Sequence, residues 1–416
     1  MQLFMAANVK RQQALVQAAL MLLYRNTSKQ EGQRYSLDTR FYLKQYRSES
    51  HRFLALQRQT SGKLRALCGL SPDICRASEV ARLTKRHDLI VSHSVLEWAP
   101  ASPMLIGAIR FELQDDWYEL PWIVAEHGLD TILKRFNAVD RYDYNGLTLA
   151  THHWQATPDC FTLQFQKSFY YNYLATNLLP EFSLPGGLTY RDLLEPGPQL
   201  SKLDSALPEN HLGISCLLRT CDGALIIPRR SQHTNVFKGQ LSPSISGAAN
   251  NATCRDPDGG YSALAWLVQE LTEELPFLAT SPDAFPTPLH QYLGGTGFLG
   301  MTRELRRCGK PELFFFLQLP IDAAKVRMLW AQHRHPGNEE AALTALQGID
   351  HNENAGLIVI DEEQLFQRIT TQVIQSKRRW PNPQQADFHV VLPKEGKDDV
   401  LSESLLANLI LYRLSQ

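Results

Sequence analysis

The stretch that decides the fold of the C-terminal half is a short acidic run, Gln269-Glu270-Leu271-Thr272-Glu273-Glu274-Leu275. At 3.6 residues per turn, leucines recur on one face of a helix through this run, at Leu264, Leu267, Leu271 and Leu275. The three glutamates share another arc of the helix, where like charges repel and mildly destabilise it. Two interpretations follow: a solvated helix face, or a site for Mg²⁺ or Mn²⁺, which prefer carboxylate oxygens and bring phosphate-bearing substrates.

The segments on either side of this run carry strand and turn signals. Upstream, residues 212–220 and 224–231 predict two strands joined by the turn Cys221-Asp222-Gly223, because an Asp-Gly pair between apolar runs is typical of a β-hairpin. A third short strand is predicted at residues 241–248 and contains Gly247 near its end. Downstream, residues 310–319 are strongly apolar and predict a buried strand.

This order of hairpin, glycine-terminated strand, glutamate-rich helix and further strand resembles the Nudix hydrolase superfamily. The family signature is a glycine, five residues, Glu, seven residues, Arg-Glu, an aliphatic residue, any residue, Glu-Glu, any residue and a glycine. Over about residues 210–320, Glu270, Glu273 and Glu274 match the metal-helix glutamates and Leu271 the aliphatic position. The resemblance implies an α/β (α+β) protein, with a Nudix-type mixed-sheet α/β/α sandwich in its C-terminal half and a helical and β-containing region before it.

The resemblance also implies a reaction, the hydrolysis of a nucleoside diphosphate linked to another moiety. Such a pyrophosphohydrolase acts on an acid anhydride and depends on Mg²⁺ or Mn²⁺. The resemblance makes Glu270, Glu273 and Glu274 the expected metal ligands, with Glu273 and Glu274 also catalytic. Phosphoryl transfer requires cations near the phosphates. The candidates that precede the helix, for which ordinary surface charge is the alternative, are Arg229, Arg230 and Lys238. Further general-base candidates, without positional support, are Glu304, Glu312, Glu339 and Glu340.

Several positions depart from the family signature. Gln269 replaces the arginine and supplies no positive charge, and Tyr261 replaces the first glutamate. Pro276 replaces the closing glycine, so the helix must end by another geometry. If Gly247 is the opening glycine, the loop to the helix is longer than in the family. Two aspartates of that loop are candidate substitutes for the missing carboxylate, Asp256 and Asp258.

The length of 416 residues predicts two or three domains. We expect a mainly helical segment at 1–90, an aromatic-rich α+β region at 91–200 and the Nudix-like domain with C-terminal helices at 205–416. The turn-rich stretches 193–200 and 205–210 are the expected linkers. Within the outer regions, the patterns predict strands at 105–113, 161–166 and 356–360, and helices at 322–346, 361–375 and 401–412.

Composition excludes several classes of protein. A formal net charge of −1 and a pI near 6.9 provide no overall attraction to nucleic acid or anionic membranes. The apolar run at residues 14–24 is too short to span a membrane and lacks a cleavage site, which favours a cytoplasmic protein. The seven cysteines form no Cys-x-x-Cys pair, so a zinc framework is not expected.

Three hypotheses of function remain open. The first is a metal-dependent hydrolase of nucleoside diphosphate derivatives. The second is a catalytically weak or inactive Nudix-fold module that senses or binds nucleotides, and the third is a module that only contacts a protein partner. The expected ligand is a small nucleotide or diphosphate, and a homodimer is the default assembly. Metal binding separates the first two hypotheses from the third, and turnover separates the first from the second.

Overall fold

The structure is a computed structural model, and it describes part of the chain. The described residues are 90–91, 94–121, 124, 145–180, 190, 194–195, 200–231, 237–252, 254–256, 258–282, 284–304, 307–334, 354–374, 387–396 and 398–416. The helices predicted for residues 1–90 and the general-base candidates Glu339 and Glu340 therefore lie outside the described residues.

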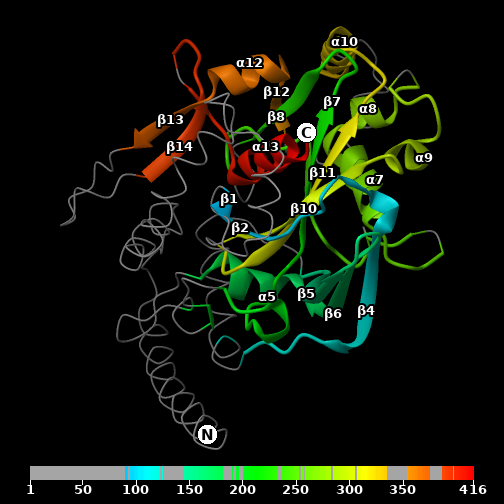
Figure 1. Cartoon of the computed structure of the whole chain (residues 1–416), viewed down its shortest axis with the longest axis vertical. Coiled ribbons are helices and arrows are strands. Elements are labelled where there is room, and N and C mark those ends of the chain that lie inside the picture. The colour runs from blue at the N-terminus through cyan, green and yellow to red at the C-terminus, as the bar shows by residue number, and fades with distance from the viewer. Residues whose placement is uncertain are drawn as a thin grey trace, which may run out of the picture.

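The protein is a mixed α/β protein built on a nine-stranded mixed sheet (Figure 1). Its central pair is parallel, and the other pairs are antiparallel. The strand order is β1 (Ile90–Val91), β2 (Ser94–Trp98), β10 (Gly297–Glu304), β11 (Lys310–Gln318), β7 (Gly213–Arg219), β8 (Ala224–Arg230) and β12 (Asn354–Asp361). In addition, β3 (Met104–Leu105) pairs with β10, and β9 (Ile245–Ala248) pairs with β7.

Two smaller sheets of three strands complete the β-structure. One has the order β4 (Ile109–Trp117), β6 (Phe161–Phe169) and β5 (Leu147–Ala156), and the other has the order β13 (Thr370–Ile374), β14 (Asp387–Leu392) and β15 (Asp399–Val400). The helices are α5 (Tyr170–Tyr173), α7 (Ala263–Glu274), α8 (Pro276–Ala279), α9 (Leu289–Leu293), α10 (Ala323–Arg334), α12 (Glu362–Arg368) and α13 (Glu403–Ser415). Short 3₁₀ turns cover Ile106–Ala108 and Leu203–Ser205, and a π-helical turn covers Leu174–Leu178.

The large sheet is buried on both faces because alternate residues of its central strands point into two different cores. Ile214 and Leu218 of β7 face one core, which they share with α7, α8, α10 and the sheet β4-β6-β5. Leu217 faces the second core, which is formed largely by α12 and α13. Figure 1 shows α13 against one face of the central strands and α7 beyond them. Such burial on both faces explains why β7 and β11 read as almost continuous apolar runs.

The last helix, α13, is more deeply buried than an amphipathic surface helix. Residues 405–412 are all buried, so apolar side chains surround the helix on nearly every side. The Ser402 side chain accepts a hydrogen bond from the N–H of Leu405 and begins the helix. Asn408 donates from Nδ2 to the carbonyl oxygen of Phe315 at 3.1 Å, which ties α13 to the centre of the sheet.

The structure confirms the hairpin, the short third strand, the acidic helix and the buried strand at β11. The predicted helix at 361–375 is wrong in its second half. After α12 the chain forms strand β13, which pairs with β14. The reason is composition: Thr370, Thr371, Val373 and Ile374 are β-branched and favour a strand. The predicted strand at 105–113 is interrupted by the 3₁₀ turn at Ile106–Ala108.

The two expected linkers are held to the body of the protein at several of their described residues: Leu194, Glu195 and residues 208–210 are buried, whereas Ser205 and Leu207 are exposed. The N–H of Asn210 donates to Oδ1 of Asn177 at 2.8 Å, and the N–H of Glu209 donates to Oγ1 of Thr176 at 3.1 Å. Moreover, β2 and β3 precede residue 200 in the chain and yet belong to the large sheet. The division at 200–205 is therefore no boundary of the sheet itself. Among the helices that the structure describes, none is both long and apolar enough to cross a membrane.

Candidate functional site

Specific residues determine where the acidic helix α7 begins and where it ends. Ser262 caps its N-terminus, because the side-chain oxygen accepts hydrogen bonds from the N–H groups of Leu264 and Ala265. The helix stops at Glu274, and Pro276 then occupies the first turn of α8, a position where proline needs no N–H partner. Where the Nudix signature has a closing glycine, this chain ends α7 and begins a second helix, α8, at Pro276.

Strand β9, which lies next to α7, pairs with β7 because the large sheet splits after the first residue pairs of β7 and β8. Strand β8 pairs with β7 only at two residue pairs near the hairpin turn and then diverges, and β9 pairs with β7 beyond the split. The Ser244 hydroxyl bridges the gap: it accepts from the N–H of Leu218 at 2.8 Å and donates to the carbonyl oxygen of Ile226 at 2.5 Å. This arrangement brings the end of β8, at Arg230, beside Ser246 of β9.

Glu270 lies against Gly247 of β9. A Cβ atom on Gly247 would be 2.0 Å from Cδ and Oε1 of Glu270, so the carboxylate occupies space that only a glycine leaves open. The indole N–H of Trp266, one turn earlier on α7, donates to Oε1 of Glu270 at 2.9 Å. Both side chains are buried, with 8% exposure for Glu270 and none for Trp266.

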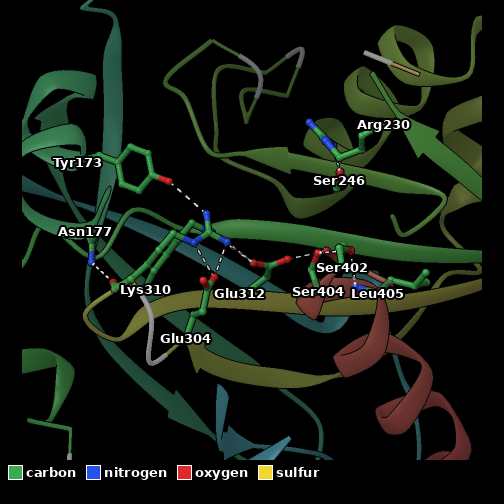
Figure 2. A network of polar contacts seen from close by, with 12 residues as sticks. Tyr173, Asn177, Arg230, Ser246, Glu304, Lys310, Glu312, Ser402, Ser404 and Leu405 are labelled. Atoms are coloured by element: carbon green, nitrogen blue, oxygen red, sulfur yellow. Dashed lines mark hydrogen bonds and ion pairs between the residues drawn. The ribbon is translucent and has the colours of Figure 1, made fainter. Parts of the chain in front are cut away.

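Glu274 lies one turn further along α7, against Ser246. Its Oε2 accepts from the N–H of Ser246 at 2.7 Å, and its Oε1 accepts from the Ser246 hydroxyl at 3.3 Å. Nη1 of Arg230 is 3.7 Å from Oε1 of Glu274 and donates to the Ser246 oxygen at 3.0 Å, the contact drawn in Figure 2. Glu270, Glu274, Arg230 and the Ser246–Gly247 pair therefore form one group, which we call the α7–β9 cluster.

Glu273 lies apart from this cluster. Its side chain is exposed, and one of its oxygens accepts a hydrogen bond from the amide of Gln269, one turn earlier on the helix. Gln269 thus partners Glu273, whereas Trp266 partners Glu270. The structure brings together two of the three predicted glutamates and leaves the third on the solvent side of α7.

The other predicted cations do not join Arg230. Arg229 forms a two-pronged ion pair with Asp399, with both N–O distances at 2.5 Å. Burial alone would raise the pKa of Asp399, but hydrogen bonds from Arg229 and Lys394 lower it below its usual value. Successive strand residues point to opposite faces, which is why neighbours in sequence separate. Lys238 is exposed.

The loop before α7 is closed by its own residues. The Tyr261 hydroxyl donates to Oδ1 of Asn251 at 2.6 Å and accepts from Arg255 at 3.0 Å. Asp256 accepts from the N–H of Gly260 at 2.8 Å and so holds a tight turn. Tyr261 and Asp256 therefore have local structural partners, and Asp258 is exposed.

The α7–β9 cluster offers few ligands to a divalent cation. Among the residues that the structure describes, no group of three or more His, Cys, Asp or Glu side chains is arranged to hold a metal ion. Two carboxylates do lie on adjacent turns of one helix, and Mg²⁺ is commonly held by one or two carboxylates together with substrate phosphates. This donor set is too small for a complete protein cage, and it would hold a cation only together with oxygen ligands from a bound diphosphate.

The sequence patterns missed a buried network of charges on β10, on β11 and in the turn between these two strands (Figure 2). Arg307 binds Glu304 through its guanidinium group and donates to the Tyr173 hydroxyl at 3.2 Å. Its Nη2 is 3.8 Å from Oε2 of Glu312, and Lys310 is 3.4 Å from the same oxygen. Two general-base candidates, Glu304 and Glu312, therefore have their carboxylates directed at cations within this network.

Burial and ion pairing shift the pKa values of the network in different directions. Burial is the largest effect on Glu304 and raises its pKa, although Arg307 opposes the shift. Burial also acts to raise the pKa of Glu312, but Lys310 and Arg307 outweigh it and lower that pKa. Burial lowers the pKa of Lys310. A sequence signal did exist, because Lys310 and Glu312 are charged positions two residues apart in an otherwise apolar strand, and such residues share one face.

The fold thus defines a mixed α/β protein with a buried acidic cluster between a helix and an edge of its large sheet. No protein-family model matches the chain, and no curated protein matches it in sequence. Among solved structures, the chain is similar to DR0079 from Deinococcus radiodurans, with 15% identity and a TM-score of 0.22. The similarity covers 37% of this chain and 69% of that one. A match of this size supports no argument about function.

Proposed function

We propose that this protein contains a Nudix-like module that hydrolyses nucleoside diphosphate derivatives with the help of Mg²⁺ or Mn²⁺. In this proposal, the large sheet with helices on both faces is a Nudix-type α/β/α sandwich. The observation that carries the proposal is the α7–β9 cluster: Glu270 lies against the strand glycine Gly247, and Glu274, one helical turn later, lies against Ser246 beside Arg230. This cluster joins the glutamate-rich helix to the short glycine-containing strand, which are two of the elements that suggested the resemblance.

The residues of the cluster, and two exposed residues outside it, have distinct parts in the proposal. Glu270 and Glu274 would hold the cation, which supplies charge neutralisation for the diphosphate and acidifies a bound water. Arg230, whose guanidinium lies beside Ser246, would bind a phosphate oxygen. Glu273 is the exposed carboxylate of the helix and would accept the proton of the attacking water. Lys238, also exposed, would contact the outer part of the substrate.

A second function, ligand binding without efficient turnover, is favoured by one observation. Glu274 already accepts hydrogen bonds from the N–H and the hydroxyl of Ser246, and Glu273 is held by Gln269. The contacts of Glu274 join α7 to β9, and the contact of Glu273 lies within α7, so both carboxylates have structural roles that hydrolysis does not require. A Nudix-like module of this kind would sense a nucleotide or contact a protein partner.

The experiment that tests the proposal is a product-release screen of the full chain against nucleoside diphosphate derivatives, with Mg²⁺, Mn²⁺ or EDTA. Glu273→Gln and Glu274→Gln test the two catalytic positions. Glu363→Gln, at an exposed glutamate on α12, is the matched control. Metal-dependent turnover that is lost in both site variants and kept in the control supports hydrolysis.

The other outcomes separate the remaining hypotheses. Metal-dependent binding of a nucleoside diphosphate without turnover, measured by calorimetry, supports the binding module and refutes the hydrolase. If neither turnover nor binding is found across the series, both nucleotide functions are refuted. In that case only the protein-contact hypothesis is left.

A further inference from the structure

We infer that Trp266 is the positioning residue for Glu270, and that its indole N–H holds the carboxylate in the orientation needed to receive a cation–diphosphate complex. The inference rests on the proposed function and assigns to a tryptophan a role at that site. It concerns a residue that carries no charge. Trp266 acts only through Glu270.

The geometry restricts the Glu270 carboxylate on two sides. On one side the Trp266 N–H donates to Oε1 at 2.9 Å. On the other side the carboxylate fills the space above Gly247, where even a single added carbon would be 2.0 Å from Oε1. A side chain held between a fixed donor and a backbone surface has few rotamers, so little ordering is needed when a ligand arrives.

Trp266 is itself rigid, which makes its N–H a fixed donor. Its side chain is fully buried in the core formed by α7 and the two sheets. An indole has one donor and no acceptor, and a buried donor without a partner costs about 1–3 kcal/mol. Loss of the Glu270 carboxylate would therefore leave the Trp266 N–H without this acceptor, and loss of Trp266 would remove a donor that orients Glu270.

Two polar neighbours of Trp266 and Glu270 are directed at other carboxylates. Gln269 precedes Glu270 directly, but its amide donates to Glu273 on the solvent side of the helix. Arg230 lies beside Glu274, at 3.7 Å. An indole orients Glu270 without adding positive charge, so it does not compete electrostatically with a cation at the same carboxylate.

The chain contains a matched control for the test. Trp154 also donates its indole N–H to a glutamate, Oε1 of Glu97, at 3.1 Å. That pair lies between strands β5 and β2, outside the α7–β9 cluster. Trp154→Phe therefore removes the same kind of hydrogen bond as Trp266→Phe, without touching the proposed site.

The experiment combines indole NMR with binding and kinetics on the full chain. The ¹⁵N–¹H resonances of the Trp266 and Trp154 indoles are followed during titration with Mn²⁺ and a non-hydrolysable nucleoside diphosphate. We expect paramagnetic broadening of the Trp266 resonance before that of Trp154. Loss of a group that orients a metal ligand typically weakens metal affinity or activity 10–100-fold. We expect about that loss in Mn²⁺ affinity and kcat for Trp266→Phe, with KM nearly unchanged, and no such loss for Trp154→Phe.

The outcomes distinguish this inference from the proposed function. If the natural chain shows neither Mn²⁺-dependent broadening nor turnover, the proposed function fails, and this inference fails with it. If the natural chain binds and turns over but Trp266→Phe behaves like Trp154→Phe, only the inference is overturned.

A second variant covers the case in which Trp266→Phe does not fold. Glu270→Leu keeps the tryptophan and removes both carboxylate oxygens. The Trp266 indole resonance should then move upfield and its proton should exchange faster with solvent. An unchanged resonance would overturn the inference.

Discussion

The contact between Gly247 and Glu270 permits a quantitative test of how the α7–β9 cluster is packed. Gly247→Ala adds one methyl group, which would lie 2.0 Å from two atoms of the carboxyl group and 2.5 Å from the third. An ordinary contact requires at least about 3.4 Å, so the carboxylate must move by about 1.4 Å. The φ of Gly247 is not positive, so the expected effect is steric and not a matter of backbone strain.

The energetic cost follows from the two ways in which the chain can respond. If the carboxylate stays in place, the overpacked contact costs about 1–3 kcal/mol. If it swings away, the buried N–H of Trp266 loses its acceptor, which costs about 1–3 kcal/mol. Either response therefore lowers the free energy of unfolding by a similar amount, and urea denaturation followed by circular dichroism measures it.

A control and a double-mutant cycle make the test specific. Gly107→Ala is the control, because an added Cβ there has no neighbour within 4 Å, and we expect a change of less than about 0.5 kcal/mol. In a Glu270→Ala background, Gly247→Ala should cost much less, since the clashing atoms are gone. An unchanged stability of Gly247→Ala, or an equal cost in both backgrounds, would refute the packing argument.

Three further predictions concern other parts of the fold. Arg307→Met should lower the free energy of unfolding by about 3–5 kcal/mol, since it removes the guanidinium that binds the buried carboxylate of Glu304; a loss below about 1 kcal/mol in urea denaturation would contradict this. The pKa of Asp399 is lowered in the folded protein by Arg229 and Lys394 against the effect of burial, so its contribution to stability is present above about pH 4 and is lost as pH falls through the folded pKa. Asp399→Asn should therefore show a shallower loss of stability between about pH 4 and pH 2 than the natural chain, and parallel curves would count against the assignment. Ser262→Ala removes the cap of α7 and should cost about 0.5–2 kcal/mol, measured in the same way.

The local elements of the C-terminal half were predictable because each carries its own periodic signal. Leucines at helical spacing located α7, and the Asp-Gly turn located the β7–β8 hairpin. Where local signals conflict, the prediction failed. At 370–374 a run of β-branched residues followed directly after a helix, and the pairing with β14 selected the strand.

The candidate site was predictable only in part. Helical spacing placed Glu270 and Glu274 one turn apart, but it also placed Glu273 on a nearby arc, and only packing against β9 separated the buried pair from the exposed residue. The partner Trp266 carries no signal that identifies it, because a tryptophan on an apolar helix face is most often simply core. Arg229 and Arg230 are adjacent in sequence and reach different partners, Asp399 and Glu274, which lie in other parts of the chain.

The sequence by itself determined the elements whose causes are local: the acidic helix, its neighbouring strands, and the end of the helix before Pro276. These depend on side-chain periodicity and on backbone restrictions within a few residues. The tertiary structure alone decided which strands pair, which residues of the expected linkers are buried, and which glutamates of α7 face β9. Those outcomes depend on contacts between residues far apart in the chain, such as Asn177 with Asn210 and Trp154 with Glu97, and no local pattern encodes them.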